Sequence, residues 1–272
     1  MVISALNPAV EQAAGLATTT SIVLILEYDG TRYHGLQLQA GLPTIQGEIE
    51  EALMELTGES IRVMSASRTD AGVHALGQVV SFRTRSSHPL KTFVKGLNYY
   101  LPGDIAVKAA HRGGDSFSIR SNAVSREYNY YILNSLTRSP LREGFSYRVA
   151  GHLDIKVMNE VCQALVGEHD FASFTSSAGA RVKGTVRRVY RAEVSRDGEL
   201  VVFSIAANSF LIHQVRNMAG PLVRVGLGKM SVEEFYNMME AKKPGLAWPT
   251  APACGLCLMR VNYPHLFEEE IQ

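Results

Sequence analysis

Strand-like and helix-like hydrophobic patterns follow one another in the same order twice along the chain. In the first series, two helical periodicities stop at Gly58 and at Pro102-Gly103, residues that commonly follow the last turn of a helix. The predicted helices are 45–56 and 90–101. The predicted strands are 22–26, 61–64, 79–83 and 105–110. This order of elements predicts a βαββαβ unit.

The second series begins near Arg126 and repeats that order. Its predicted strands are 128–133, 186–194, 200–206 and 256–261, and its predicted helices are 158–165, 211–224 and one more after Ser231. Asp197-Gly198 is a strong hairpin signal. Ser231 with Glu234 forms the capping box that begins the last helix, and Pro221 is expected to kink the helix that it interrupts.

Two successive units of this kind predict an α/β (α+β) fold made of two ferredoxin-like βαββαβ halves. We expect largely antiparallel sheets, joined around a central cleft. The chain has 272 residues, enough for two domains. The expected divisions are a flexible tail at 1–20, an N-terminal ferredoxin-like domain at 21–124 and a C-terminal ferredoxin-like domain at 125–272.

Charge is balanced in total and uneven in distribution. The formal net charge of +1 gives no hint of a nucleic-acid partner, yet residues 1–60 hold one base and eight acids, whereas residues 61–148 hold 13 bases and five acids. Any electrostatic footprint must therefore be local. We expect the bases of 61–148 to line the approach to a site and the acids of 48–59 to face away from it.

Cysteine content and hydropathy favour a cytoplasmic protein. Three cysteines form no disulfide framework and fit a reducing compartment. No apolar run approaches the roughly 18–20 residues that a membrane span requires, and the N-terminus lacks the basic region of a signal peptide.

Several enzyme signatures are absent from the sequence. Gly228-Lys229 is followed by Met230 where a phosphate loop needs Ser or Thr. Cys254 and Cys257 are spaced as C-x-x-C, but no second cysteine pair completes a zinc site, and in an extended segment they leave opposite faces. We therefore predict core cysteines, no bound metal and no cofactor motif.

The most unusual segment runs from Ser65 to Gln78, between two apolar strands. In it Arg68 and Asp70 are flanked by small residues that let a ligand approach the backbone, as expected of a site built on a loop. The same residues also suit an ordinary turn in which Arg68 pairs with Asp70. His74 is equally open to a structural or a functional interpretation.

Two further places carry ambiguous chemistry. Arg216 falls on the apolar stripe of a predicted helix, where a guanidinium is costly unless a carboxylate meets it or unless it extends to solvent. Alternation puts Arg126, Tyr128 and Tyr130 on one strand face. Aromatic and arginine side chains together suit base stacking, while tyrosines packed in a core are an equally good explanation.

With these residues assembled, the chain resembles the bacterial tRNA pseudouridine synthase A family. The resemblance extends over nearly the whole chain after the tail. It is most specific in the segment Arg68-Thr69-Asp70-Ala71-Gly72-Val73-His74-Ala75. Supporting segments are Glu27-Tyr28-Asp29-Gly30, Leu101–Val107, Gly167–Phe171, Arg126-Glu127-Tyr128, Ala207–Phe210, Val215-Arg216-Asn217 and Gly255-Leu256.

The chain departs from the family pattern at two places. Ser67 stands where the family usually has Gly, and Gly35-Leu36-Gln37-Leu38-Gln39 stands where it usually has Gly-Trp-Gln-Arg-Gln. The second departure puts RNA contacts near residues 36–38 in doubt and leaves the catalytic pattern intact.

The resemblance implies an isomerase that converts uridine to pseudouridine at positions 38–40 of the tRNA anticodon stem-loop, without a cofactor. It implies a homodimer that binds tRNA. Asp70 would be the covalent nucleophile, Arg216 its ion-pair partner and Tyr128 the residue that stacks on the flipped base. Arg68, Leu256 and His74 would contact the substrate.

Two other functions remain open from the residues alone. An RNA-binding module with the same fold would retain tRNA at low salt and do no chemistry. A hydrolase that uses Asp70 with His74 would yield a cleaved product in place of an isomer.

Overall fold

The computed structural model describes residues 19–114, 116–180 and 184–264. Nearly all of the predicted tail, residues 1–18, lies outside these ranges. So do Arg181 and Lys183, which form with Arg187, Arg188 and Arg191 a basic run that the sequence predicts to contact phosphates.

The N-terminal half has the order of the ferredoxin-like unit. Its strands are β1 (Thr20–Tyr28), β2 (Met64–Ser65), β3 (His74–Thr84) and β4 (Ile105–Arg112), and its helices are α1 (Ile45–Thr57) and α2 (Leu90–Tyr100). Strand β1 pairs antiparallel with both β3 and β4, and β2 pairs with the outer side of β3. Gly58 ends α1 in the left-handed conformation, at φ +70°, as its sequence position predicts.

The C-terminal half repeats that order with additions. Its strands are β5 (Ser125–Leu133), β6 (Tyr147–Arg148), β7 (Gly167–Asp170), β8 (Val186–Asp197), β9 (Leu200–Ala207) and β10 (Leu256–Asn262). Its helices are α3 (Ile155–Leu165), α4 (Ser177–Ala180), α5 (Gln214–Gly226) and α6 (Val232–Glu240), with 3-10 turns at Ala172–Phe174 and Ala253–Gly255. The hairpin at Gly198 and the capping box of Ser231 with Glu234 are confirmed.

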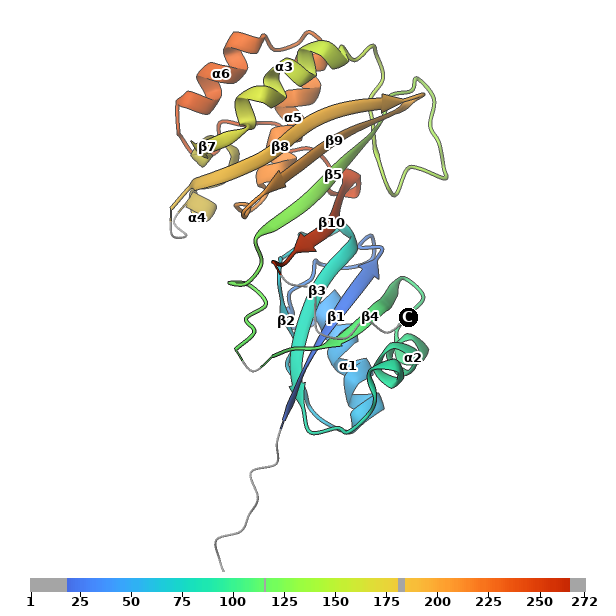
Figure 1. The fold of residues 1–272 in the computed structure, drawn as a ribbon. Helices are drawn as coiled ribbons and strands as arrows, with labels where there is room; N and C mark the ends of the chain where they lie inside the picture. The colour runs from blue at the N-terminus through green and yellow to red at the C-terminus, as the bar shows by residue number, and fades with distance from the viewer. Residues whose placement is uncertain (1–18, 115, 181–183, 265–272) are drawn as a thin grey trace, which may run out of the picture.

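The two halves join through β3 and β10, which pair in parallel with His74 opposite Cys257 and Ala75 opposite Leu258. The result is a ten-stranded sheet with the main order β4-β1-β3-β10-β5-β9-β8-β7. In Figure 1, α3, α5 and α6 gather over the β8–β9 end, and α1 and α2 lie at the other end. The predicted fold class is confirmed. A division at 124/125 stays a prediction, because the strands of both halves share this sheet.

Three predicted elements differ from the structure. Of the predicted strand 61–64, only Met64 lies in β2 (Met64–Ser65) and pairs with β3, because the amide of Val63 donates to the Glu50 carboxylate of α1. Strand β3 begins at His74, five residues before the predicted start. Helix α5 begins at Gln214 and not at 211, because His213 has φ +60°, and it continues through Pro221 to Gly226.

A continuous apolar core runs through both halves. It includes Leu24 and Phe93 in the first half and Tyr130, Phe203 and Met218 in the second, all fully buried. Among the helices of the described residues, none is long and apolar enough to cross a membrane.

Candidate active site

A cavity of about 410 Å³ lies beside the junction of the two halves. Its lining comes from the loop 66–70, from β5, from the segment 209–215 before and within the start of α5, and from the first residue of β10. Among the described residues that line it, Asp70 is the only acid, and Arg68, Arg120 and Arg126 are the cations. The cavity is therefore built to receive a ligand that carries negative charge.

Asp70 forms an ion pair with Arg216, although 146 positions separate them. Nη1 of Arg216 donates to Oδ2 of Asp70 at 3.0 Å, and its Nε donates to the carbonyl of Ala251 at 2.9 Å. The Asp70 side chain is 28% exposed and that of Arg216 18%, so the pair is shielded but open to the cavity. Two anchored donors fix the plane of the guanidinium and, through it, the direction of the carboxylate.

The opposite oxygen of Asp70 faces a histidine. Nε2 of His213 lies 3.6 Å from Oδ1, beyond hydrogen-bond distance. His213 is the residue before α5 and has a left-handed backbone, and its side chain does not cap the helix. The sequence contained no signal for this contact.

The Asp70 loop contacts the end of β1 and the turn that follows it. The hydroxyl groups of Tyr28 and Thr69 are 2.8 Å apart, and the amide of Leu36 donates to the carbonyl of Thr69 at 3.1 Å. Gly35 has φ +89°, and a Cβ on it would lie 2.7 Å from that same carbonyl. The turn therefore packs against the loop through bare backbone, which explains why glycine stands there.

Tyr128 lies on the cavity side of β5. Its ring meets that of Phe210 edge to face, with centroids 5.2 Å apart. The pKa of Tyr128 is raised to about 12, mainly by burial and to a lesser extent by the charge of Asp70, while a hydrogen bond with the Ser67 side chain acts in the opposite direction. The phenol is thus neutral and available as a donor near pH 7.

The other aromatic and arginine residues of that strand face have structural contacts. Tyr130 is fully buried, and its hydroxyl donates to the carbonyl of Pro252 at 2.8 Å. Arg126 lines the cavity and is 8% exposed. Of the three, Tyr128 and Arg126 line the cavity, Tyr130 belongs to the core, and Arg126 also donates to backbone carbonyls.

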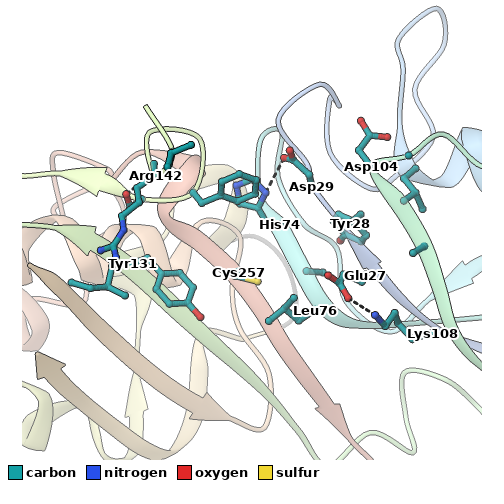
Figure 2. Close-up of a pocket in the computed structure, with 18 residues that line it drawn as sticks. Glu27, Tyr28, Asp29, His74, Leu76, Asp104, Lys108, Tyr131, Arg142 and Cys257 are labelled. Atoms are coloured by element: carbon teal, nitrogen blue, oxygen red, sulfur yellow. Dashed lines mark hydrogen bonds and ion pairs between the residues drawn. The ribbon is translucent and has the colours of Figure 1, made fainter. Parts of the chain in front are cut away.

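The remaining predicted site residues divide between two cavities. Arg68 is exposed and lines the Asp70 cavity, and Leu256, 6% exposed, lines it as well. His74 lines a second cavity of about 670 Å³, shown in Figure 2. Val73 lines the first cavity and His74 the second, because successive side chains leave opposite faces of an extended segment. The structure therefore does not bring His74 together with Asp70.

His74 is fixed between the two halves. Its Nδ1 lies 3.1 Å from a carboxylate oxygen of Asp29, and its Nε2 is 3.0 Å from the carbonyl of Gly144. A carbonyl only accepts, so Nε2 carries the hydrogen. The ring of Phe145 lies 4.8 Å from that of His74. Figure 2 shows His74 beside Asp29.

The acids of 48–59 are turned toward other partners. Glu50 pairs with Arg62, and Glu59 accepts from Thr84 and from nearby amides. Within the described residues, none of these acids lines the Asp70 cavity, whereas Arg68, Arg120 and Arg126 of the basic block do. This part of the charge prediction is confirmed.

The C-x-x-C cysteines have ordinary surroundings. Cys257 is buried in β10 and Cys254 lies in the turn before it, so only one of them belongs to the predicted extended segment. Burial raises the pKa of both thiols. The described residues contain no group of three or more His, Cys, Asp or Glu that is placed to hold a metal ion.

Similarity to known proteins covers most of the chain. A family model described as tRNA pseudouridine synthase matches residues 24–120 and 161–264. A tRNA pseudouridine synthase A of Pelobacter propionicus is 44% identical over 243 residues, which are 89% of this chain and 99% of that protein. A protein of the same name in Legionella pneumophila is 42% identical over 249 residues, 90% of this chain and 94% of its own.

Among solved structures, a chain in the crystal structure of a Cbf5-Nop10-Gar1 complex aligns with 75% of this chain and 54% of its own. The two chains are 14% identical in sequence and superpose with a TM-score of 0.32. The match to the family model, together with 42–44% identity to relatives over nearly their whole length, shows that the chain belongs to the tRNA pseudouridine synthase A family.

Proposed function

We propose that the protein isomerises uridine to pseudouridine in the anticodon stem-loop of tRNA, at positions 38–40, with Asp70 as a covalent nucleophile and without a cofactor. The observation that carries this proposal is the ion pair of Asp70 with Arg216, beside a cavity in which, among the described lining residues, Asp70 is the only acid and three arginines are the cations. A carboxylate that is oriented by a guanidinium and open to a cavity is equipped to attack a nucleotide.

The reaction needs only groups of this kind. The N1–C1′ bond breaks, uracil turns and C5 bonds to C1′, so that C5 loses a proton and N1 gains one. No electrons are exchanged with another molecule and no group leaves the nucleotide. Asp70 forms a covalent bond to the nucleotide, at C1′ or at the base, in the first half of the reaction. That bond breaks in the second half and frees the carboxylate.

The other cavity residues support this chemistry by position. Tyr128 presents its ring to the cavity and stacks on the flipped uracil, and its neutral hydroxyl can relay the C5 proton. Leu256 contacts the base from another side. Flipping the uridine out of its stack costs a few kcal/mol. Arg68, which is exposed at the cavity, offsets this cost by taking the place of the base in the stack.

Phosphate contacts explain the uneven charge. Arg68, Arg120 and their neighbours in the block 61–148 position the tRNA backbone without reading its sequence. Binding should therefore weaken as salt rises.

The positions of Asp70 and His74 in the fold disfavour the hydrolase alternative. It needs Asp70 and His74 in one site, but they line separate cavities. The binding-module alternative leaves the oriented Asp70 carboxylate without a purpose.

We also propose a homodimer in the cytoplasm. Leu76, Leu141 and Phe145 line the second cavity and are 46%, 93% and 50% exposed. A group of large apolar side chains at the surface is typical of a protein interface.

Mapping of pseudouridine in tRNA tests the proposal. The tRNA from cells that lack the protein is incubated with purified protein. Modified positions are read by mass spectrometry after selective cyanoethylation of pseudouridine, because pseudouridine and uridine have the same mass. We expect new pseudouridine at positions 38–40. Modification elsewhere would refute the position, and a cleaved base would support the hydrolase.

A further inference from the structure

Arg126 is a buried cation that has no acidic partner among the described residues. It lies on β5 beneath the Asp70 cavity, 8% exposed. Burial lowers the pKa of its guanidinium, which means that the protein gives up stability to keep a charge at this place. A residue retained at such a cost has a use that an apolar side chain cannot supply.

The guanidinium of Arg126 donates to four backbone carbonyls. Nη1 reaches Asn208 at 2.8 Å and Ala123 at 3.2 Å, and Nη2 reaches Arg120 at 3.2 Å and Ala66 at 3.3 Å. These carbonyls satisfy the buried donors, so the charge is tolerated without a carboxylate.

The four carbonyls belong to three segments, two of which lead to the reactive groups and one of which supports the Asp70 loop. Ala66 lies four residues before Asp70. Asn208 opens the segment that brings Phe210 to Tyr128 and then Arg216 to Asp70. The third segment, 120–123, also holds the Asp70 loop, since Nε of Arg120 donates to the carbonyl of Ser65 at 3.0 Å.

We propose that Arg126 is a positioning residue that holds the Asp70 loop and the segment before α5 at the separation required by the Asp70–Arg216 pair. This inference rests on the proposed function. A planar fork of donors can span carbonyls from separate segments, whereas the ammonium of lysine presents its donors from a single atom. The permanent charge beneath the cavity also favours an anionic substrate.

The test compares Arg126→Ala and Arg126→Lys with wild type in single-substrate kinetics of tritium release from C5-labelled tRNA. We expect kcat to fall about 10²-fold in Arg126→Ala, as for a misplacement near 1 Å, while KM for tRNA changes little. Millimolar guanidinium should restore much of the lost kcat in Arg126→Ala by filling the vacated site. Equal urea or NaCl should not.

Amide hydrogen exchange supplies a readout that does not depend on activity. In Arg126→Ala we expect faster exchange over 66–70, 120–123 and 208–214 only, with protection regained in guanidinium. The matched control is Arg196→Lys, because Arg196 also donates to a carbonyl, that of Leu153, but far from the cavity. This control should keep its kcat and its exchange pattern at 66–70.

Each other outcome would overturn the proposal. Wild-type kcat in both variants would do so, as would a loss confined to KM, an absence of rescue by guanidinium, or unfolding of Arg126→Lys as well as Arg126→Ala. If wild type releases no tritium, the proposed function fails, and the exchange experiment still decides whether Arg126 holds the two segments.

Discussion

The turn after β1 should set the position of Asp70 through a contact that only glycine permits. A Cβ on Gly30 would lie 2.0 Å from the carbonyl oxygen of Val73 and 2.7 Å from its carbonyl carbon. Such a Cβ essentially never approaches within 3.0 Å. In Gly30→Ala, the turn or the backbone of Val73 must therefore move by about 1 Å.

Either movement reaches the reactive carboxylate. The amide of Val73 donates to the carbonyl of Asp70 at 3.2 Å, and Tyr28, the last residue of β1 and two positions before Gly30, has its hydroxyl 2.8 Å from that of Thr69. A displacement of about 1 Å costs about 10²-fold in rate. Overpacking costs about 1–3 kcal/mol in the free energy of unfolding, and each kcal/mol lowers Tm by about 2–4 °C in a chain near this size.

The assay is tritium release from C5-labelled tRNA together with thermal unfolding. The control is Gly103→Ala, because a Cβ on Gly103 meets no atom within 4 Å and its φ is not positive. We expect the control to match wild type in kcat and Tm. Unchanged kcat in Gly30→Ala, or an equal loss in the control, would refute the link between the turn and Asp70.

Three further predictions concern other parts of the molecule. Arg216→Gln should lose about 10²–10³-fold in kcat, since a preorganised charged donor is removed, and wild-type kcat would exclude the ion pair from the reaction. The pKa of Tyr128 is raised from 10.0 to about 12, so its contribution to stability is present below pH 10 and is lost as pH rises toward 12. That contribution is about 3 kcal/mol in the free energy of unfolding. Between pH 10 and 12 the Tm of Tyr128→Phe should therefore fall less than the Tm of wild type. An equal fall in both proteins would contradict the claim that burial raises the pKa of Tyr128. Leu141 is 93% exposed, and Leu141→Asp should shift the protein from dimer to monomer in analytical ultracentrifugation. A dimer unaffected by Leu141→Asp would place the interface elsewhere.

Local periodicity was sufficient for the main elements and their order, but it did not predict the short elements β6, β7 and α4. The helix at 45–57 and the hairpin near Gly198 follow from apolar spacing and turn residues within short windows. The pairing of β3 with β10 could not be predicted in this way, because it joins His74 to Cys257 across most of the chain. Strand partners at that separation are chosen by packing of the whole fold.

The candidate site shows the same division. The position of Arg216 on an apolar stripe left two explanations open, an acidic partner or a side chain that extends to solvent, and only the resemblance named Asp70 as the partner. The fold places the two side chains 3.0 Å apart. The start of β3 at His74 also decides which face each motif residue takes, and a boundary is the least certain feature of a pattern. Contacts of His213 and Arg126 with other segments left no trace in spacing.

The central claim is that Asp70 is the nucleophile. The most direct measurement is tritium release from C5-labelled tRNA by Asp70→Asn beside wild type, with tRNA binding and Tm measured on the same samples. Arg216 keeps its contact with the carbonyl of Ala251, so the variant should fold and bind tRNA. We predict release by wild type and none by Asp70→Asn, and undiminished release by Asp70→Asn would contradict the account.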